Sequence, residues 1–372
     1  VGPLYPAVLA CLYALVGHRP EWVPILQVGF DLGTAWSVYR IGTILWGERI
    51  GALAAAFAFL YPAYWTYDPR IRSEALLTCL MSVWLWVTID CGQRPSHRRY
   101  AILGVTAGLT ILCKPVAMIL AVLLIGCIWL DMDRALKKVA YALVYGVTCL
   151  LLVAPWSVRN YLAFHEFIPV SAGIGAGLWM GSDPVSRGSW PMPLEREHAI
   201  WESAGITPLP HAYAMYDVQT DQFLRKKGID RIMADPLCYV RLIMTRAWDF
   251  WIGNSFYLAN AESELMHGFW KDVTERGWIV ACYSLLKRLL LIPAIVVIAV
   301  CSAWVHRKRW HELLPLYLFP IGLTAGYVPF TVEAGRYALP VLPCLMVLSV
   351  ALVFQSRMSW IWNTKPQLAH RS

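Results

Sequence analysis

The chain has 372 residues, of which 58% are hydrophobic and 15% charged, and its mean hydropathy is +0.51. Because a soluble domain carries about 25% charged residues, this composition excludes an ordinary soluble protein and predicts an all-α polytopic membrane protein. The net charge of +8 fits basic loops that orient membrane helices. The sequence has no basic arm or recognition motif, so no nucleic-acid partner is predicted.

The first apolar stretch, "PLYPAVLACLYALVG" (3–17), has about 15 residues and starts with two prolines. A membrane span needs about 20 apolar residues, so we predict an interfacial or re-entrant helix on the outer face. A full span is the alternative. An N-terminus on the outer face would require an export signal, so we expect a signal-anchor helix and the start of an outer loop upstream of residue 1.

Nine further apolar runs are candidates for membrane helices. They are 22–46, 48–66, 73–91, 99–114, 115–131, 138–155, 279–304, 312–330 and 336–355. Two of them, 99–114 and 115–131, are short and meet at "CKP", which predicts a tight helical hairpin. We therefore expect a bundle of about nine transmembrane helices plus interfacial helices.

Three basic clusters orient this bundle: "QRPSHRR" (93–99), "DRALKK" (133–138) and "HRKRWH" (306–311). They follow the third, fifth and seventh spans, so all three lie on one side, which the positive-inside rule assigns to the cytoplasm. The C-terminal tail falls on the same side. The sequence thus predicts a multi-pass protein of the cell membrane with a cytoplasmic C-terminus.

The chain divides into three predicted parts. Residues 1–155 form an N-terminal transmembrane bundle, 156–278 an extracytoplasmic region, and 279–372 the last membrane helices and the tail. Within the middle part, aromatic and aliphatic residues of 221–254 alternate with basic ones at helical spacing. This pattern favours one amphipathic helix in the plane of the membrane interface.

One carboxylate lies within a predicted span. Asp31 is in the middle of 22–46, and Arg40 follows nine residues later on the opposite helix face, so the two cannot pair. Intramembrane charges are expensive and are candidates for function. We predict that Asp31 bonds a neighbouring helix; a role in catalysis is the alternative.

Charged residues also gather at the predicted outer ends of the helices. Four cations come from four separate outer connections: Arg72, Lys114, Arg159 and Arg336. Arginine and lysine are natural phosphate ligands, so we predict that a bundle brings these cations together around one acidic headgroup. The alternative is that each cation meets lipid headgroups separately. Glu74 and Glu333 are the acids at the same level.

Other chemical signals are weak. "GIGAG" (173–177) has the glycines of a nucleotide loop, but no strand precedes it; it either bends the backbone close to a ligand or is a flexible loop. The nine histidines form no zinc-protease motif and the ten cysteines lie singly. We therefore predict no intrinsic cofactor.

Five segments follow one another along the chain: "GPLYPAVLACLYALVG" (2–17), the two spans and acidic helix start of 26–78, "GLTILCKPVAMIL" (108–120), "PWSVRNYLAFHEFIPVSAGIGAGLWMGSDP" (155–184) and "RYALPVLPCLMVLSV" (336–350). In this order they resemble family 39-type membrane glycosyltransferases of the GT-C fold, which are related to protein mannosyltransferases and lipid A aminoarabinose transferases. Glu74 stands at the family's acidic position, and Lys114 stands where arginine is usual.

This resemblance implies transfer of a sugar from a polyprenyl-phosphate donor to a lipid, glycan or protein acceptor at the outer face of the membrane. It assigns phosphate binding to the four cations and a cavity wall to Trp156, Asn160, Tyr161 and Trp179. The resemblance is compatible with a divalent metal but does not indicate one. Membrane lipids, the lipid-linked donor and the acceptor are the expected partners.

The resemblance also raises a question about the general base. The family's base is an aspartate early in the first outer loop, and this chain has no acidic residue before Glu21. We expect the aspartate upstream of residue 1, so that the chain as written lacks transferase activity, with Glu74 and Glu333 as fallback bases. The alternatives are a non-catalytic lipid-binding relative and a secondary transporter, although no inverted repeat supports a transporter.

Overall fold

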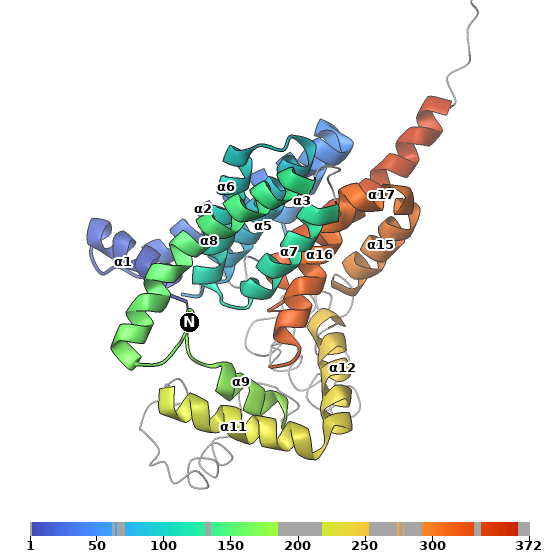
Figure 1. The fold of residues 1–372 in the computed structure, drawn as a ribbon. Coiled ribbons are helices and arrows are strands. Elements are labelled where there is room, and N and C mark those ends of the chain that lie inside the picture. The colour runs from blue at the N-terminus through green and yellow to red at the C-terminus, as the bar shows by residue number, and fades with distance from the viewer. Residues whose placement is uncertain are drawn as a thin grey trace, which may run out of the picture.

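The structure is a computed structural model, and it describes residues 2–61, 64, 71–130, 135–184, 218–252, 274, 278, 292–330 and 336–363. These residues form helices and loops, with no strand among them. Long helices lie side by side in a bundle, and a smaller group of helices lies at one end of it (Figure 1). The predicted all-α fold is confirmed for the part of the chain that is described.

Each of the nine predicted apolar runs overlaps a described helix of the bundle. The helices are α2 (Trp22–Trp46), α3 (Glu48–Phe59), α5 (Glu74–Gln93), α6 (His97–Cys113), α7 (Ala117–Leu130), α8 (Ala135–Phe164), α15 (Ile292–Val305), α16 (Trp310–Tyr327) and α17 (Leu342–Asn363). Among the described residues, two helices are long and apolar enough to cross a membrane by length and composition: α5 and the Leu136–Phe164 part of α8. The count of about nine membrane crossings therefore remains a prediction.

Helix α1 (Leu4–Val16) precedes the bundle and has 13 residues. At 1.5 Å per residue it is about 20 Å long, whereas the hydrocarbon core of a bilayer is about 30 Å thick. The helix is thus too short to span in a straight line. Its length agrees with the predicted interfacial or re-entrant helix.

The hairpin predicted around "CKP" is confirmed, since α6 ends at Cys113 and α7 begins at Ala117. The two helices then pack on different neighbours, α6 on α8 and α7 on α16. A Cβ at Gly104 of α6 would collide with the carbonyl oxygen of Tyr145 on α8, so the two helices approach closely at this glycine. The hairpin therefore holds two sides of the bundle together.

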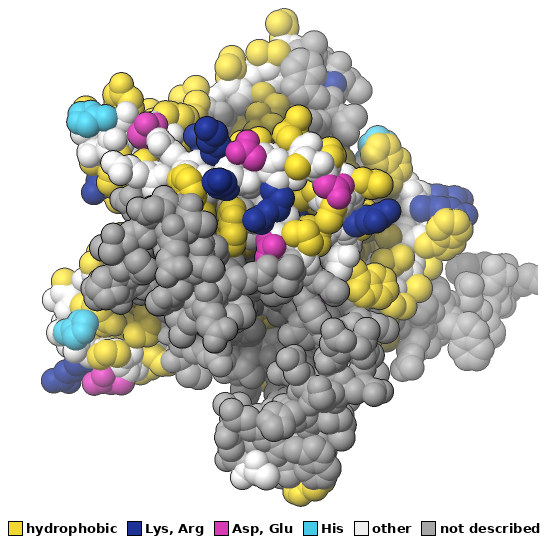
Figure 2. Space-filling view, turned by 90° about the horizontal axis from the view of Figure 1, so that it is seen from below, with side chains coloured by type: hydrophobic (Ala, Val, Ile, Leu, Met, Phe, Trp, Pro, Cys, Tyr) yellow, Lys and Arg dark blue, Asp and Glu magenta, His cyan; other side chains and the backbone are white. Residues whose placement is uncertain are grey.

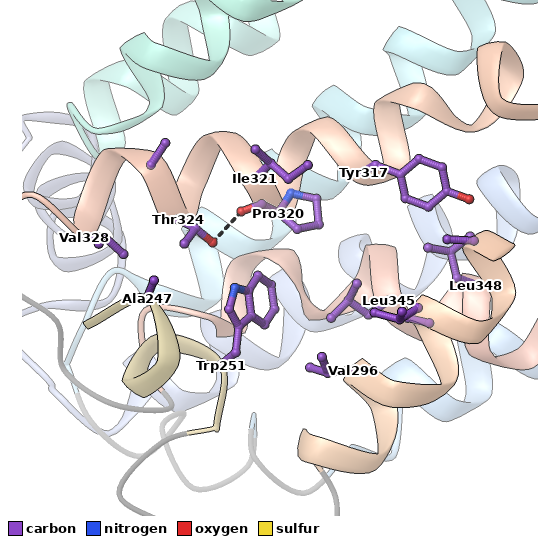
Figure 3. A pocket seen from close by; sticks show the side chains of 14 residues that line it. Ala247, Trp251, Val296, Tyr317, Pro320, Ile321, Thr324, Val328, Leu345 and Leu348 are labelled. Atoms are coloured by element: carbon purple, nitrogen blue, oxygen red, sulfur yellow. Dashed lines mark hydrogen bonds between the residues drawn. The ribbon is translucent and has the colours of Figure 1, made fainter. Parts of the chain in front are cut away.

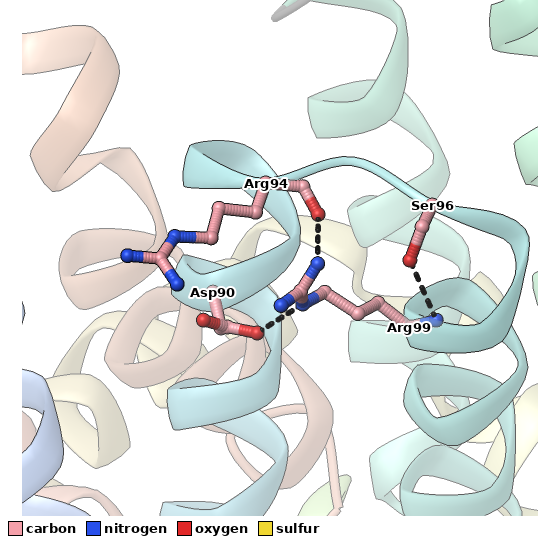
Figure 4. A network of polar contacts seen from close by, with 4 residues as sticks. All are labelled: Asp90, Arg94, Ser96 and Arg99. Carbon is pink, nitrogen blue, oxygen red and sulfur yellow. Dashed lines mark hydrogen bonds and ion pairs between the residues drawn. The ribbon is translucent and has the colours of Figure 1, made fainter.

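The connection between α5 and α6 contains the first basic cluster, and polar contacts order it (Figure 4). The Ser96 hydroxyl accepts from the backbone N–H of Arg99 at 3.3 Å and so caps α6. The Arg99 guanidinium pairs with Asp90 at 2.6 Å and donates to the Arg94 carbonyl at 2.9 Å. The cytoplasmic placement of this connection remains a prediction.

The sequence prediction placed the end of a helix at Pro155, and this was wrong: α8 continues through Pro155 to Phe164. Proline inside a helix leaves one carbonyl without its donor. The face of α8 around Pro155 is held by contacts with the segment that returns past it: Trp156 Nε1 donates to Val170 O at 2.8 Å, and Ser157 Oγ to Pro169 O at 2.6 Å. The motif thus folds the chain back on the helix instead of opening a loop.

The single amphipathic helix predicted over 221–254 is also corrected. The structure has two helices there, α11 (Val218–Ala234) and α12 (Pro236–Ile252). Pro236 takes the first position of α12, where its missing N–H costs nothing, and Asp235 Oδ1 accepts from the Cys238 backbone N–H at 2.9 Å. The chain turns at this junction, so that α11 lies across the end of the bundle and α12 extends toward it (Figure 1).

Helix α9 (Ile174–Gly181) packs on α11 and completes the layer at this end of the bundle. Figure 2 views the molecule from this side and shows basic and acidic side chains interspersed on the described surface. Helix α11 contributes exposed charges of both signs, among them Arg225, Lys226, Lys227 and Asp230. The described surface of α11 is thus rich in charge, whereas α2 and α8 expose mainly large apolar side chains.

Candidate active site

A buried ionic cluster lies at the end of the bundle near α9 and α11. Glu74 is the first residue of α5 and is only 4% exposed. Its Oε1 accepts from Arg336 Nε at 2.7 Å and lies 2.6 Å from Arg336 Nη2. Lys114 Nζ lies 3.5 Å from the same oxygen. One carboxylate oxygen thus holds two cations that come from distant parts of the chain.

The ends of four helices place these three side chains. Glu74 benefits from the positive end of the α5 dipole. Lys114 follows the last residue of α6 in an extended conformation, and Pro115 after it prevents the helix from continuing. Arg336 lies just before the 3-10 turn η5 (Leu339–Val341), which leads into α17. These helix ends lie at the same end of the bundle, so the packing of the helices brings the three side chains together.

Tyrosine rings surround the cluster. The Tyr337 ring centroid lies 5.4 Å from Lys114 Nζ and 5.7 Å from Arg336 Cζ, within the range of cation–π attraction. Tyr327 stacks on Tyr337 with a centroid distance of 4.2 Å. Tyr5 of α1 lies on the Glu74 side, and burial together with the Glu74 charge raises its pKa to about 12. Its hydroxyl therefore stays protonated at physiological pH.

Among the described residues, the cluster consists of two cations that share one carboxylate. Glu74 Oε2 is also buried and, among the described residues, has no hydrogen-bond partner. Lys114 and Arg336 keep 23% and 18% of their side-chain surface exposed. The cluster can therefore accept an anionic group from outside and can offer one carboxylate oxygen to a hydrogen-bond donor.

An apolar cavity of about 480 Å³ lies between α12, α15, α16 and α17 (Figure 3). Trp251, Val296, Ile321, Leu345 and Leu348 point toward it, and Thr324 turns its hydroxyl to the Pro320 carbonyl at 2.7 Å. The cavity follows α16 from Tyr317 to Val328, about 16 Å at 1.5 Å per residue. Val328 is next to Tyr327, so the cavity ends beside the tyrosines of the ionic cluster.

Known proteins resemble this chain in sequence and in fold. Residues 1–158 match the sequence model of the family described as dolichyl-phosphate-mannose-protein mannosyltransferase. The chain also superposes on solved structures of an archaeal oligosaccharyltransferase. The chain has the GT-C fold. The resemblance drawn from the sequence motifs is thereby confirmed.

Three solved structures of the oligosaccharyltransferase from Archaeoglobus fulgidus share this GT-C fold. One is a complex with zinc and sulfate (TM-score 0.53, 11% identity, 97% of this chain and 42% of that chain). A second, of AglB with an inhibitory peptide and a dolichol-phosphate, has a TM-score of 0.54 and 13% identity, covering 100% and 44%. A third, tethered to an acceptor peptide with the NVT sequon, has a TM-score of 0.52 and 10% identity, covering 99% and 44%.

The chain therefore spans less than half the length of these structures, and no curated protein sequence matches it significantly. At 10–13% identity the likeness concerns the fold. Among the described residues of this GT-C bundle, no group of three or more histidine, cysteine or acidic side chains is arranged to hold a metal ion.

The four predicted phosphate ligands are only partly brought together. Lys114 and Arg336 meet at Glu74. Arg72 is half-buried two residues before Glu74, and its backbone N–H lies near the Tyr5 hydroxyl. Arg159 is exposed on α8 and its guanidinium lies 5.1 Å from the ring of Trp156 on the same helix. The fallback acid Glu333 falls outside the described residues.

The predicted cavity-wall residues have other surroundings. Trp156 and Asn160 hold the return segment, since Asn160 Nδ2 donates to the carbonyls of Ile168 and Val170 at 3.0 and 3.1 Å. Tyr161 is 55% exposed. Trp179 is buried between α9 and α11, with Arg231 Cζ 5.1 Å from its ring. None of the four lines the apolar cavity of Figure 3.

The glycine run "GIGAG" forms the start of α9, and a side chain of the protein occupies its free N–H groups. Asp221 Oδ1 of α11 accepts from the backbone N–H groups of Gly173, Gly175 and Ala176 at 3.0, 2.8 and 3.2 Å. A Cβ at Gly175 would overlap the Asp221 carbonyl. The glycines therefore let α9 approach α11, and a helix N-terminus receives the negative charge it favours.

Asp31 is buried in α2, at 5% exposure, and faces α5, where it lies within electrostatic range of Cys79. The predicted bond from Asp31 to a neighbouring helix stays a prediction. The sequence did not predict the tyrosines of the cluster, because the chain has eighteen tyrosines and no local pattern distinguishes those that lie together in the fold. Arg246 was not predicted either, although a single cation within the largely apolar stretch "LIMTRAWDFW" indicates a buried charge with specific partners.

Proposed function

We propose that this chain is a membrane glycosyltransferase that takes a sugar from a polyprenyl-phosphate donor and passes it to a lipid, glycan or protein acceptor at the outer face of the membrane. The observation that carries the proposal is the meeting of Lys114 and Arg336 at a buried carboxylate, next to the end of an apolar cavity. A lipid-linked sugar needs both features, because its phosphate is charged and its chain is apolar.

In this proposal the phosphate of the donor binds Lys114 and Arg336. Arginine offers two parallel N–H groups to a phosphate, whereas lysine acts as a compact point charge. A hydrogen bond to a charged group contributes about 1.5–3 kcal/mol. The same two cations would stabilise the phosphate as it departs from the anomeric carbon, which is where negative charge develops in glycosyl transfer.

The prenyl chain would lie in the cavity along α16. Its lining is almost entirely apolar and runs parallel to the helices of the bundle. The end at Val328 adjoins Tyr327, which stacks on Tyr337 beside the two cations. A donor can therefore extend from the cluster into the bundle with its charge and its chain each in a matching environment.

Glu74 would hold the two cations in place. Its Oε1 accepts from Arg336 and lies 3.5 Å from Lys114 Nζ, and a carboxylate between two cations is a weak proton acceptor. The free Oε2 can receive a hydroxyl of the donor or acceptor. We therefore assign Glu74 to positioning, so that the general base of the reaction is another carboxylate.

The similar proteins support this function by their kind of donor. The matching family is described by its use of dolichyl-phosphate mannose, and one oligosaccharyltransferase structure holds a dolichol-phosphate and a peptide. Arg72 would reach the phosphate from beside Glu74, whereas Arg159 would contact lipid headgroups from the exposed side of α8. Among the described residues, no group of three or more histidine, cysteine or acidic side chains is arranged to bind a divalent metal.

The test is direct binding of polyprenyl phosphate to the full chain in lipid nanodiscs, followed by a transfer assay with polyprenyl-phosphate sugars. Wild-type protein should bind the lipid, and Lys114→Ala should weaken binding about tenfold or more, as expected from the loss of one charge-assisted hydrogen bond. Lys137→Ala on the exposed part of α8 is the matched control. No binding of polyprenyl phosphate by the wild type would overturn the proposal.

A further inference from the structure

Arg246 on α12 is a charged residue in an unusual setting, because only 1% of its surface is exposed. Its Nε donates to the carbonyl of Val328 at 2.6 Å, and its Nη1 donates to the carbonyl of Gly181. Burial lowers its pKa from the usual value, while the charge of Asp249 one turn along the helix counteracts this. Arginine remains protonated under these conditions. A buried charge is costly, so its retention here calls for a role.

The two carbonyls belong to different elements. Gly181 is the last residue of α9, and Val328 follows the last residue of α16. Tyr239, also on α12, donates its hydroxyl to the Pro329 carbonyl at 2.7 Å. Two consecutive carbonyls of the turn after α16 are thus held from α12. The glycine at 181 lets the turn approach, because a Cβ there would collide with the carbonyls of Pro329 and Phe330.

This turn is joined to the ionic cluster by ring contacts. Tyr327, immediately before Val328, stacks on Tyr337 at 4.2 Å. Tyr337 in turn lies against both Lys114 and Arg336. Phe250, one helical turn after Arg246, lies 6.2 Å from the Tyr327 ring. Helix α12 therefore contacts both the backbone that follows Tyr327 and the ring of Tyr327 itself.

We propose that Arg246 is a positioning residue for the Glu74–Lys114–Arg336 cluster, and that it acts through the turn 327–330 and the Tyr327–Tyr337 stack. The guanidinium fixes the turn relative to α9, and the stack transmits that position to the wall beside the two cations. The inference rests on the proposed binding of a polyprenyl phosphate at the cluster. It adds that the layer of α9, α11 and α12 sets the geometry of the headgroup site.

A guanidinium is suited to this task because its planar N–H groups can serve two carbonyls at fixed directions. Lysine at this position would keep the charge and one carbonyl contact but lose the second. Glutamine would lose the charge as well. We therefore expect a graded series, with polyprenyl-phosphate affinity about threefold lower in Arg246→Lys and about tenfold lower in Arg246→Gln, since small displacements of binding groups have large effects.

The experiment measures two quantities on full-length protein in nanodiscs, using only the folded, monodisperse fraction of each variant. The first is the dissociation constant for polyprenyl phosphate. The second is amide hydrogen exchange of peptides that cover residues 113–116 and 324–330. Arg241→Gln, an exposed arginine on the same helix, is the matched control. Tyr239→Phe is a milder variant that removes one hydrogen bond to the turn and no charge.

The expected result is faster exchange at both peptides in Arg246→Gln, a smaller change in Tyr239→Phe, and affinities that fall in the same order. If exchange rises only at 324–330 while affinity is unchanged, Arg246 is a local structural clamp and the inference is wrong. If wild-type protein binds no polyprenyl phosphate, the proposed function fails. In that case the exchange at 113–116 still decides whether Arg246 positions the cluster.

Discussion

At the scale of single residues, the charge of Glu74 decides how the cluster behaves without a ligand. Two cations share its Oε1 in a buried setting. Removing one partner of a buried ion pair typically costs about 3–5 kcal/mol, because an uncompensated charge remains. The cluster is therefore stable with Glu74 in place. A phosphate would either displace Glu74 from the two cations or bind them in addition to Glu74.

This reasoning predicts the behaviour of Glu74→Gln. The unliganded variant should unfold at a lower temperature than wild type, because Lys114 and Arg336 lose their shared counter-ion. Polyprenyl phosphate supplies a replacement negative charge, so the rise in unfolding temperature on adding it should be larger in the variant. Thermal unfolding with and without the lipid measures both. An unchanged thermal shift together with lost transfer would instead make Glu74 the general base.

Lys114 should tolerate substitution by arginine better than substitution by alanine. Lys114→Arg keeps the charge at the tip of the hairpin and should retain donor use within a few-fold, whereas Lys114→Ala should lose about ten- to a hundredfold. Transfer or binding assays over a range of donor concentrations measure the difference. Arg40→Gln is the control, because Arg40 lies over Trp86 away from the cluster; an equal loss there would point to general destabilisation.

At the scale of elements, glycines set how closely the helices approach. A Cβ at Gly104 of α6 would collide with Tyr145 and Thr148 of α8, whereas nothing lies within 4 Å of a Cβ at Gly146 of α8. Gly104→Ala should therefore lower the free energy of unfolding by about 1–3 kcal/mol. Gly146→Ala should raise it by up to about 1 kcal/mol, because alanine favours the helix. Equilibrium unfolding in detergent with a denaturant compares them, and equal effects would contradict the packing.

The attachment of α9 to α11 offers a second test at this scale. Asp221 satisfies three backbone N–H groups at the start of α9, and substitution of a capping carboxylate by alanine costs about 0.5–2 kcal/mol. Asp221→Ala should speed proteolysis or hydrogen exchange in residues 171–181, and Asp221→Asn should do so less. Asp230→Ala, an exposed acid on the same helix, should leave exchange in that segment unchanged.

At the scale of the whole molecule, orientation in the membrane is the prediction that most depends on the sequence pattern. Single cysteines placed at Ser96 and at His165, in a background without other reactive cysteines, should be labelled from opposite sides by an impermeant reagent. Ser96 lies in the first basic cluster and His165 directly after α8. Labelling of position 165 only after lysis would reverse the orientation and place the cluster on the cytoplasmic side.

Much of the bundle could be predicted because apolar runs and prolines act locally. Run length located the helices, and the "CKP" break located the hairpin, since neither depends on a distant partner. The same local reasoning failed at Pro155, where α8 continues and the side chains of Trp156 and Ser157 bond the returning segment. It also failed over 221–254, where an aspartate and a proline divided one apparent helix into two.

The sequence by itself determined that this chain forms apolar helices with basic connections, that it resembles GT-C glycosyltransferases, and that several helix ends carry cations. The tertiary structure decided which of those cations meet. Glu74 and Arg336 are 262 positions apart, and a contact at that separation depends on the packing of every helix between them. An ion pair requires its charged groups to lie within about 4 Å of each other, so no pattern of residue types could select Lys114 and Arg336 over Arg159.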